Sequence, residues 1–306
     1  MKKFSEGNKM FFNVMAIFVV FAIVVIIFED YERNYLHPLD EVSDWHLLLF
    51  SFVIMLILGA LLHRYSRRMD ERISREQAEK QNEMRRELTQ NIAHELKTPV
   101  ASILAYSETL RNNPSLSEDK RQMFINRTYA QAFRMTALLQ DLSTLNRMEY
   151  APTQLAMEPI DVAGVFKTVC DELAITLNEH HITVDNGLPT SLVLTGNDRL
   201  LYSVFRNLME NAVAYAGDGT TVTLKVLSEK GRCHFIFSDN GIGVDDAHLP
   251  RLFERFYRID KSRSRRLGGT GLGLAIVKNA IQFHGGTITA SNNQPHGLRF
   301  DFTLPQ

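Results

Sequence analysis

Residues 268–274 read GGTGLGL and stand directly before an apolar segment that runs to about residue 284. Glycines at the start of a helix leave backbone N–H groups exposed, and such groups bind anions such as phosphate. The stretch is not a Walker loop, because it lacks Gly-Lys-Ser/Thr. It is not a Rossmann fingerprint either, because it does not follow the first strand of a parallel unit. It predicts a phosphate-binding turn of another kind, at the start of a helix.

The sequence on both sides of this turn alternates between two periodicities. Helical patterns occur near 161–178, 198–216 and 272–284, and strand-like runs occur near 181–185, 221–227, 232–238, 286–291 and 298–304. This alternation predicts an α/β sandwich with a mostly antiparallel sheet over residues 161–306. Residues 151–160, which contain Pro152 and Pro159, are expected to form a linker.

Two further motifs fall at the edges of this predicted sandwich. Asn207 and Asn211 lie one helical turn apart, and carboxamide oxygens suit a Mg²⁺ ion that is shared with phosphate. Asp239 ends a strand-like run, where its carboxylate can accept a hydrogen bond from an exocyclic amine. Gly241 and Gly243 follow it and let the backbone approach a flat ring. Each motif is common by itself, so only their combination indicates a nucleotide site.

Residues 244–267 join these motifs and are rich in arginine, with Phe253, Phe256 and Tyr257 interleaved. The basic side chains are Arg251, Arg255, Arg258, Lys261, Arg263, Arg265 and Arg266. Nucleic-acid binding is one explanation of such a stretch. A mobile lid over phosphates is favoured instead, because the stretch lies between the two predicted nucleotide motifs. The whole chain has 34 basic and 35 acidic residues, which also argues against binding nucleic acid through bulk charge.

Residues 88–150 have the pattern of a helical hairpin. Leu88, Ile92, Leu96, Ile103 and Leu110 form one apolar face, and residues 112–117 contain the helix-breaking sequence Asn-Asn-Pro. The second helix presents another apolar face from Ile125 to Met148. Two such helices cannot cover their own apolar stripes, so we expect two copies to pair into a four-helix bundle.

His94 lies within the first of these helices but off its apolar face, in the sequence His94-Glu95-Leu96-Lys97-Thr98-Pro99. Glu95 can accept a proton from the imidazole, and Thr98 places a hydroxyl one turn away on the face of His94. The group offers an exposed nitrogen nucleophile with an adjacent base. A surface histidine is more often inert, and the spacing is not that of a zinc protease, because Thr98 replaces the second histidine.

Two uncharged segments near the N-terminus predict membrane spans, at residues 11–28 and 45–62. A signal peptide and a buried helix are the respective alternatives. However, no small-residue cleavage site follows the first segment, and basic residues flank both segments on the sides away from the short connection. The acidic connection, residues 29–44, is therefore expected outside and both termini in the cytoplasm. Residues 64–87 are expected to form a charged helical linker, and Cys170 and Cys233 are expected to stay reduced.

The order of these motifs resembles the membrane sensor histidine kinases of two-component systems. The resemblance covers about residues 85–306 and rests on the box at His94–Pro99, Asn207 with Asn211, Asp239-x-Gly241-x-Gly243, Phe253 with Phe256, and Gly269-x-Gly271-x-Gly273. It implies a membrane-anchored fold with a dimeric four-helix bundle and a C-terminal α/β sandwich of the Bergerat type. It also implies a bacterial inner-membrane location, and a homodimer that works with a response regulator.

The resemblance further implies a role for each motif. His94 would accept the γ-phosphate of ATP with Glu95 as base, and Thr98 would orient water when the kinase dephosphorylates its partner. Asn207 and Asn211 would hold Mg²⁺ and ATP, and Asp239 would bind the adenine amine. The remaining nucleotide-binding candidates are Tyr215, Gly241, Gly243, Phe253, Arg258, Arg263, Gly269, Gly271, Leu272 and Gly273.

Two departures from the family pattern qualify this resemblance. Ala214 stands where many members carry a lysine, so one phosphate-binding charge is missing. Only about thirty residues separate the second predicted span from His94, which is too short for the usual relay module. The alternatives are an ATPase related to gyrase, a nucleotide-binding membrane adaptor, and a kinase whose main output is dephosphorylation. With so small an external loop, the expected signal source is the membrane or a partner membrane protein.

Overall fold

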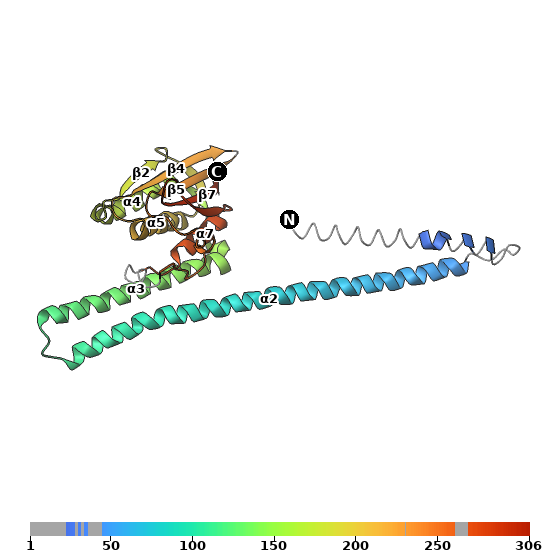
Figure 1. Ribbon diagram of the computed structural model, residues 1–306, viewed down its shortest axis with the longest axis horizontal. Helices are drawn as coiled ribbons and strands as arrows, with labels where there is room; N and C mark the ends of the chain where they lie inside the picture. The colour runs from blue at the N-terminus through green and yellow to red at the C-terminus, as the bar shows by residue number, and fades with distance from the viewer. Residues whose placement is uncertain (1–22, 28–29, 32–33, 36–44, 230, 261–268) are drawn as a thin grey trace. The chain divides into compact units, whose positions relative to one another are not determined.

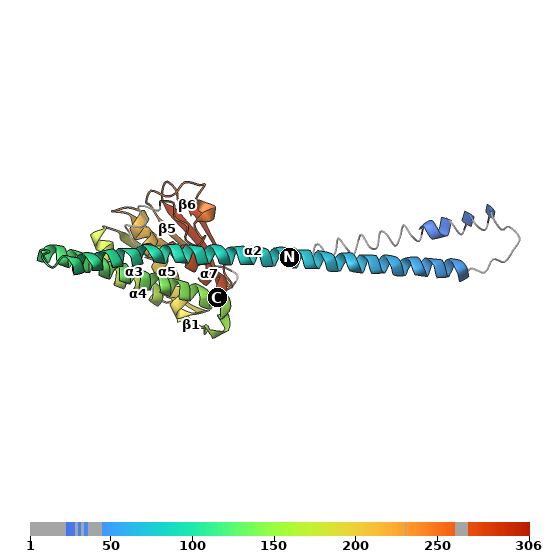
Figure 2. The same cartoon turned by 90° about the horizontal axis from the view of Figure 1, so that it is seen from below.

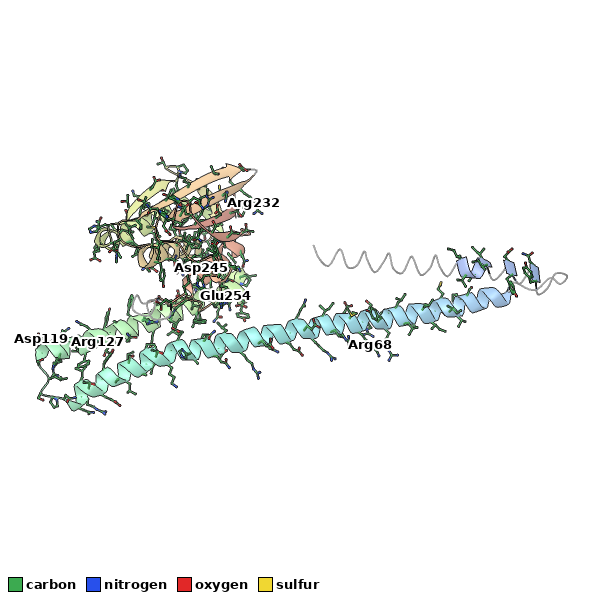
Figure 3. All side chains as sticks on the ribbon, viewed as in Figure 1. Arg68, Asp119, Arg127, Arg232, Asp245 and Glu254 are labelled. Carbon is green, nitrogen blue, oxygen red and sulfur yellow. The ribbon has the colours of Figure 1, made fainter. Side chains whose placement is uncertain are left out.

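The computed structural model describes residues 23–27, 30–31, 34–35, 45–229, 231–260 and 269–306. Its internal contacts divide the chain into two units, Met1–Met84 and Arg85–Gln306. Helix α2 (Trp45–Asn112) begins in the first unit and ends in the second (Figure 1). Figure 3 shows Arg68 projecting from the part of α2 that belongs to the first unit.

Within the described residues, no helix contains a stretch both long enough and apolar enough to cross a membrane. The predicted span at 11–28 and the acidic connection at 29–44 lie mostly outside these residues. The predicted span at 45–62 falls on α2, although the side chains of residues 45–50 are not described. Both spans therefore stay predictions.

The second unit begins with the helical hairpin that the sequence predicts. Helix α2 ends at Asn112, and α3 runs from Glu118 to Tyr150, so the predicted break at 112–117 is confirmed. The turn is closed by a hydrogen bond from the Leu116 amide to the Asn113 carbonyl, 3.3 Å long. Near its C-terminal end α3 buries Leu138, Leu145 and Met148 and packs against helix α7.

The rest of the second unit is an α/β domain. Its helices are α4 (Val162–Glu179), α5 (Asp198–Tyr215) and α7 (Gly273–Phe283). Two 3₁₀ turns, η2 (Pro152–Gln154) and η3 (Leu249–Arg251), accompany them. The strands are β1 (Glu158–Asp161), β2 (Thr183–Gly187), β3 (Val193–Gly196), β4 (Thr221–Glu229), β5 (Arg232–Asp239), β6 (Ile288–Asn292) and β7 (Leu298–Pro305).

The main sheet has the strand order β2-β4-β5-β7-β6. The β2–β4 pair is parallel and the other pairs are antiparallel, which confirms the expected mostly antiparallel sheet. Helices α4, α5 and α7 cover one face of the sheet (Figures 1 and 2). Alternate residues of β5 and β7 point into this layer, where Phe205, Phe235 and Phe302 are fully buried and pack ring against ring. This layered core fixes the ends of β5, α5 and α7, which carry the nucleotide motifs.

The predicted linker at 151–160 is partly wrong. Residues 158–160 belong to β1, which pairs antiparallel with β3 in a separate two-stranded sheet. Strand β3 was not predicted from the sequence patterns either. Both strands have only four residues, too few to establish a periodicity, and Pro159 argued against a strand.

Candidate functional site

The predicted phosphoacceptor, His94, lies exposed on α2. Thr98 is exposed one turn further along, and its hydroxyl donates to the His94 carbonyl oxygen at 3.5 Å. Ser102 in turn donates to the Thr98 carbonyl at 3.0 Å. The imidazole and the hydroxyl therefore lie on the same strip of α2, as the spacing predicts, with the imidazole accessible to a substrate.

Glu95 has two cationic neighbours. Its Oε2 accepts a hydrogen bond from Nη2 of Arg258 at 3.1 Å and lies 3.7 Å from Nη2 of Arg134 on α3. Sequence reasoning gave Glu95 the role of a base and Arg258 that of a phosphate contact. In this structure the two side chains bind each other, and both roles stay predictions. Nη2 of Arg258 would have to release Glu95 before that nitrogen could contact a phosphate.

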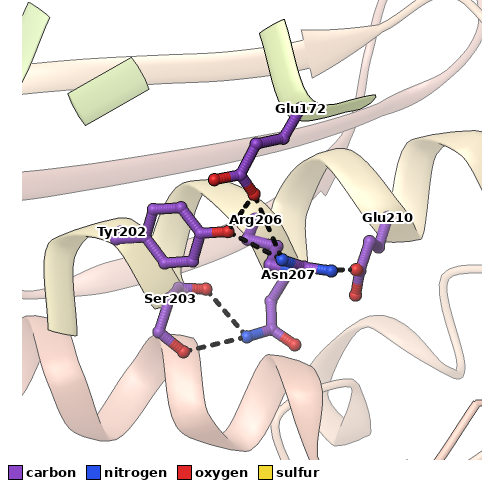
Figure 4. A network of polar contacts seen from close by, with 6 residues as sticks. All are labelled: Glu172, Tyr202, Ser203, Arg206, Asn207 and Glu210. Carbon is purple, nitrogen blue, oxygen red and sulfur yellow. Dashed lines mark hydrogen bonds and ion pairs between the residues drawn. The ribbon is translucent and has the colours of Figure 1, made fainter. Parts of the chain in front are cut away.

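Asn207 and Asn211 lie one turn apart on α5, and both are half-buried. The Asn207 amide nitrogen donates to the carbonyl and the hydroxyl of Ser203, at 2.7 and 3.2 Å (Figure 4). These two bonds leave the carboxamide oxygen of Asn207 available to a cation. A Cβ added to Gly273 would lie 2.4 Å from this oxygen, so the asparagine motif and the glycine turn are immediate neighbours.

Arg206, the neighbour of Asn207 on α5, forms a network that no sequence motif predicted. Its guanidinium binds Glu210 at 2.8 Å, the Tyr202 hydroxyl at 2.7 Å and Glu172 of α4 at 3.4 Å (Figure 4). Tyr202 also donates to Glu172. The spacing of Tyr202, Arg206 and Glu210 by four residues is a signal that could have revealed the part of the network on α5.

Asp239 is buried at the end of β5. Its Oδ1 accepts hydrogen bonds from the Gly241 amide at 2.9 Å and from the Leu298 amide at 3.1 Å. Burial raises the pKa of this carboxyl, and the two amide donors oppose that shift. Oδ2 takes part in neither bond, so one carboxylate oxygen remains for a ligand while the other holds the side chain in place.

Gly241 and Gly243 permit the turn that follows Asp239. A Cβ at Gly241 would lie 2.4 Å from the Ala216 carbonyl oxygen, and Gly243 has a φ of 68°, which favours glycine. Tyr215, one of the predicted nucleotide-binding residues, lies beside Ala216 at the end of α5 and is 37% exposed. Ala214, which stands in place of a lysine, is half-buried.

The glycine turn leads directly into α7. Gly269 and Gly271 are half-buried, Leu272 is fully buried, and Gly273 is the first residue of the helix. The Gly271 carbonyl accepts a hydrogen bond from the Phe256 amide at 2.8 Å, which joins the turn to the preceding lid. Gly271 has a φ of 72°, and a Cβ there would lie 3.0 Å from the backbone of Phe256.

Thr270, in the middle of the turn, donates to Oδ2 of Asp141 on α3 at 2.8 Å. Burial raises the pKa of Asp141, whereas the Thr270 hydrogen bond lowers it. Asp141 belongs to no sequence motif, although its spacing from Leu138 and Leu145 places an acidic residue on the buried stripe of α3. That conflict with the apolar pattern was a usable signal.

Two lid residues occupy defined positions. Phe253 packs edge to face on Phe300 of β7, and the Lys278 ammonium lies 5.9 Å from its ring. The Arg258 side chain is only 6% exposed, and its Nε has no hydrogen-bond partner among the described residues. Arg263 lies outside the described residues. Figure 3 marks Asp245 and Glu254, which lie in the same segment between β5 and α7.

These residues fit a magnesium nucleotide. The described residues contain no cluster of three or more His, Cys, Asp or Glu side chains able to hold a metal. The oxygens of Asn207 and Asn211, together with phosphate oxygens, make a donor set that suits Mg²⁺. Gly241, Gly271 and Gly273 leave room where a side chain would collide with the fold.

Two family models match the chain. The His Kinase A (phospho-acceptor) domain matches residues 84–151. The histidine kinase-, DNA gyrase B- and HSP90-like ATPase matches residues 196–306.

Curated relatives include the sensor histidine kinase WalK of Bacillus subtilis, 33% identical over 74% of this chain and 38% of its own length. The phosphate regulon sensor protein PhoR of Pseudomonas aeruginosa is 35% identical over 71% of this chain and 49% of its own length. SenX3 of Mycolicibacterium smegmatis is 32% identical over 72% of this chain and 58% of its own length. The chain thus spans about half the length of the curated relatives that it matches.

Two solved structures resemble the fold. The histidine kinase AdeS of Acinetobacter baumannii has a TM-score of 0.56 at 23% identity, covering 69% of this chain and 97% of that chain. Full-length ShkA in complex with AMPPNP has a TM-score of 0.52 at 26% identity, covering 69% of this chain and 44% of that chain.

Proposed function

The chain belongs to the sensor histidine kinases of two-component systems, and we propose that it phosphorylates its own His94 from Mg²⁺–ATP. The observation that carries this proposal is the contact between Arg258 and Glu95, at 3.1 Å. Through it the lid of a nucleotide site reaches the residue next to an exposed histidine. A nucleotide-binding domain and a phosphoacceptor helix that meet in this way support phosphoryl transfer between them.

The proposed reaction needs few protein groups. An imidazole nitrogen of His94 attacks the γ-phosphorus, an N–P bond forms, and the bond from phosphorus to the β–γ bridging oxygen breaks as ADP leaves. Glu95, once released by Arg258, accepts the proton of the other ring nitrogen. The phosphoryl group then passes to an aspartate of a response regulator. In this proposal Thr98 orients water for a second activity, removal of phosphate from that regulator.

Asn207, Asn211 and Asp239 hold the substrate in this proposal. A Mg²⁺ ion supplies charge neutralisation at the phosphates, held by the oxygens of Asn207 and Asn211. Oδ2 of Asp239 accepts a hydrogen bond from the adenine amine, and Tyr215 packs against the base. The Gly269–Gly273 turn presents backbone N–H groups to the triphosphate at the start of α7.

In this proposal the helical hairpins of two copies of the chain pair into a bundle. Val100, Leu104, Tyr129 and Phe133 are exposed on α2 and α3, with 48–73% of their surface accessible. A dimeric four-helix bundle would cover these apolar side chains. The receiver domain of a cognate response regulator is the other proposed protein partner.

We also propose that residues 11–28 and 45–62 anchor the chain in a bacterial inner membrane, with both termini in the cytoplasm. The support is the uncharged sequence of both segments and the distribution of charge around them. Large apolar side chains of α2, among them Phe52, Leu56 and Ile57, are also more than half exposed. Cysteine labelling tests the orientation: Glu41→Cys should react with an impermeant reagent outside intact cells, whereas Glu79→Cys should not.

The deciding experiment is incorporation of phosphate from γ-labelled Mg²⁺–ATP into the full-length chain. Acid-labile, alkali-stable label is expected on the wild type, and its loss in His94→Gln and Asn211→Ala. His63→Gln, an exposed histidine on the same helix, is the matched control and should keep its label. Label that survives His94→Gln would identify another acceptor. ATP hydrolysis without any label would favour an ATPase.

A further inference from the structure

The loop that carries Asp239 is attached to the turn between β6 and β7 by two asparagine side chains. Nδ2 of Asn293 donates to the Asp239 carbonyl oxygen at 2.9 Å. Asn292 binds further along the loop. Its Oδ1 accepts from the Val244 amide at 3.0 Å, and its Nδ2 donates to the Val244 carbonyl at 2.7 Å and to Asp246 at 2.8 Å. The two asparagines thus bind both ends of the segment from Asp239 to Val244.

The chemistry of these partners fixes the orientation of both amide groups. The Val244 amide can only donate, so it requires the carboxamide oxygen of Asn292, and the Val244 carbonyl requires the NH₂ group. The Asp239 carbonyl likewise requires the NH₂ group of Asn293. Neither aspartate nor leucine, which are close in size to asparagine, could make the same bonds.

The start of β7, directly after this turn, also contacts the Asp239 carboxylate. The Leu298 amide donates to Oδ1 at 3.1 Å, and Leu298 begins β7 just after the turn. Gly297 approaches so closely that a Cβ there would lie 1.9 Å from the Asp239 carbonyl oxygen. The position of the turn therefore sets the direction of Oδ2, the carboxylate oxygen that remains for the base.

We propose that Asn292 and Asn293 are positioning residues for adenine recognition, which orient Asp239 through the β6–β7 turn without touching the nucleotide. The inference rests on the proposed function, because it takes Asp239 as the residue that binds the adenine amine. It adds two residues, which belong to none of the nucleotide motifs, that determine how well the site distinguishes an amino-purine from other bases.

The test compares ATP with purine riboside triphosphate, which has hydrogen in place of the 6-amino group. Only ATP can donate to Asp239, so the ratio of the two dissociation constants measures the amine contact. In the full-length wild type we expect ATP to bind about tenfold tighter, as for one hydrogen bond to a charged acceptor. In Asn293→Ala the ratio should fall to about threefold or less, and in the double variant with Asn292→Ala to about one.

The affinity for the purine analogue is the internal reference for this comparison. We expect it to change less than about twofold in both variants, since the analogue does not use the amine contact. A merely structural role would weaken both nucleotides equally and leave the ratio unchanged, which would overturn the inference. Asn186→Ala is the matched control, because that asparagine also braces backbone in the same domain, with its oxygen 3.1 Å from the Leu188 amide. Its ratio should equal that of the wild type.

Failure of the proposed function gives a different result. A wild-type chain that prefers ATP over the analogue but places no label on His94 would contradict the kinase proposal and leave the adenine inference supported. A wild-type chain that binds both nucleotides equally would overturn the adenine inference, whatever the result at His94.

Discussion

The loop after β5 and the lid that follows it along the chain are held by different parts of the molecule. The loop at Asp239–Val244 is bound by backbone and side chains of its own domain, from Leu298, Asn292 and Asn293. The lid and the glycine turn also have partners in their own domain, but they bind the helical hairpin as well, through Arg258 to Glu95, Arg255 to Glu149 and Thr270 to Asp141. The proposed base-binding loop is therefore held within its own domain, whereas Arg258, a proposed phosphate contact, is bound by the hairpin.

The largest effect is expected at the proposed base-binding loop. Asp239→Asn keeps an oxygen for the Gly241 and Leu298 amides but presents an NH₂ group to the adenine amine. ATP affinity should fall about 30- to 100-fold, because the hydrogen bond worth about tenfold is lost and two N–H donors then face each other without an acceptor. Titration calorimetry measures the affinity, and an unchanged melting temperature should show that the fold is kept. An affinity within threefold of the wild type would mean that Asp239 does not bind the base.

At the contact with the hairpin, Glu95→Gln and Arg258→Ala should change ATP affinity in opposite directions. Glu95→Gln weakens the bond that holds Arg258 and should tighten ATP binding about three- to tenfold, while label on His94 falls for lack of a base. Arg258→Ala removes a phosphate contact and should weaken ATP binding about tenfold. Both affinities can be measured by calorimetry in the full-length chain.

The opposite signs make this pair a strict test of competition. Arg251→Ala is the matched control, because Arg251 pairs with Glu254 at the surface of the same segment and should leave ATP affinity unchanged. If Glu95→Gln leaves ATP affinity unchanged, Glu95 and the phosphates of ATP do not compete for Arg258.

The free energy of unfolding is expected to depend on pH through His284, at the end of the helix that the glycine turn begins. The buried His284 at the end of α7 accepts a hydrogen bond from the Asn197 amide on Nε2, at 2.8 Å, and Nδ1 donates to the Ala280 carbonyl at 2.7 Å. Protonation of Nε2 would break the first bond, and burial lowers the pKa of His284 below its ordinary value of 6.5. The unfolded chain therefore binds the proton more readily. The contribution of His284 to stability is complete above pH 6.5 and is lost as the pH falls from there towards the lowered pKa.

Chemical denaturation at pH 7.5 and 5.5 measures this effect. The unfolding free energy of the wild type should fall on acidification by more than that of His284→Gln, which has no titrating group at this position. Equal pH dependence in the two proteins would contradict the assignment. The ratio of ATP to purine-analogue affinity should be the same at both pH values, since the base-binding loop is held by other residues.

The smallest effect is expected at Arg255. Its ion pair with Glu149 is 3.0 Å long, but both side chains are about one-third exposed, so the pair contributes only about 0.2–1 kcal/mol. Arg255→Ala should therefore change ATP affinity less than about threefold. A tenfold gain in affinity would mean that surface pairs, rather than the buried Arg258, hold the lid on the hairpin.

The local geometry of the candidate nucleotide site could be predicted from the sequence, because its motifs are local. Glycine is required where the turn at residue 271 has positive φ, and Asn207 and Asn211 share a helix face because they are one turn apart. The hairpin break at 112–117 was equally local. The four-residue strands β1 and β3 were not predicted, because each is too short to show a periodicity and is stabilised by pairing with the other.

By itself the sequence determined which chemical groups the chain carries and how neighbours along each helix or turn are arranged, including His94 beside Glu95 and the glycines before α7. Only the tertiary structure decided which distant side chains meet. Asn293 lies 54 positions from Asp239 along the chain, and Arg258 lies 163 positions from Glu95. Such pairs are set by how the sheet, helices and hairpin pack, and no local periodicity encodes the partner of a side chain across that distance. The chemical groups of the candidate site follow from the motifs. The contacts that hold Asp239 and Arg258 in position follow from the fold.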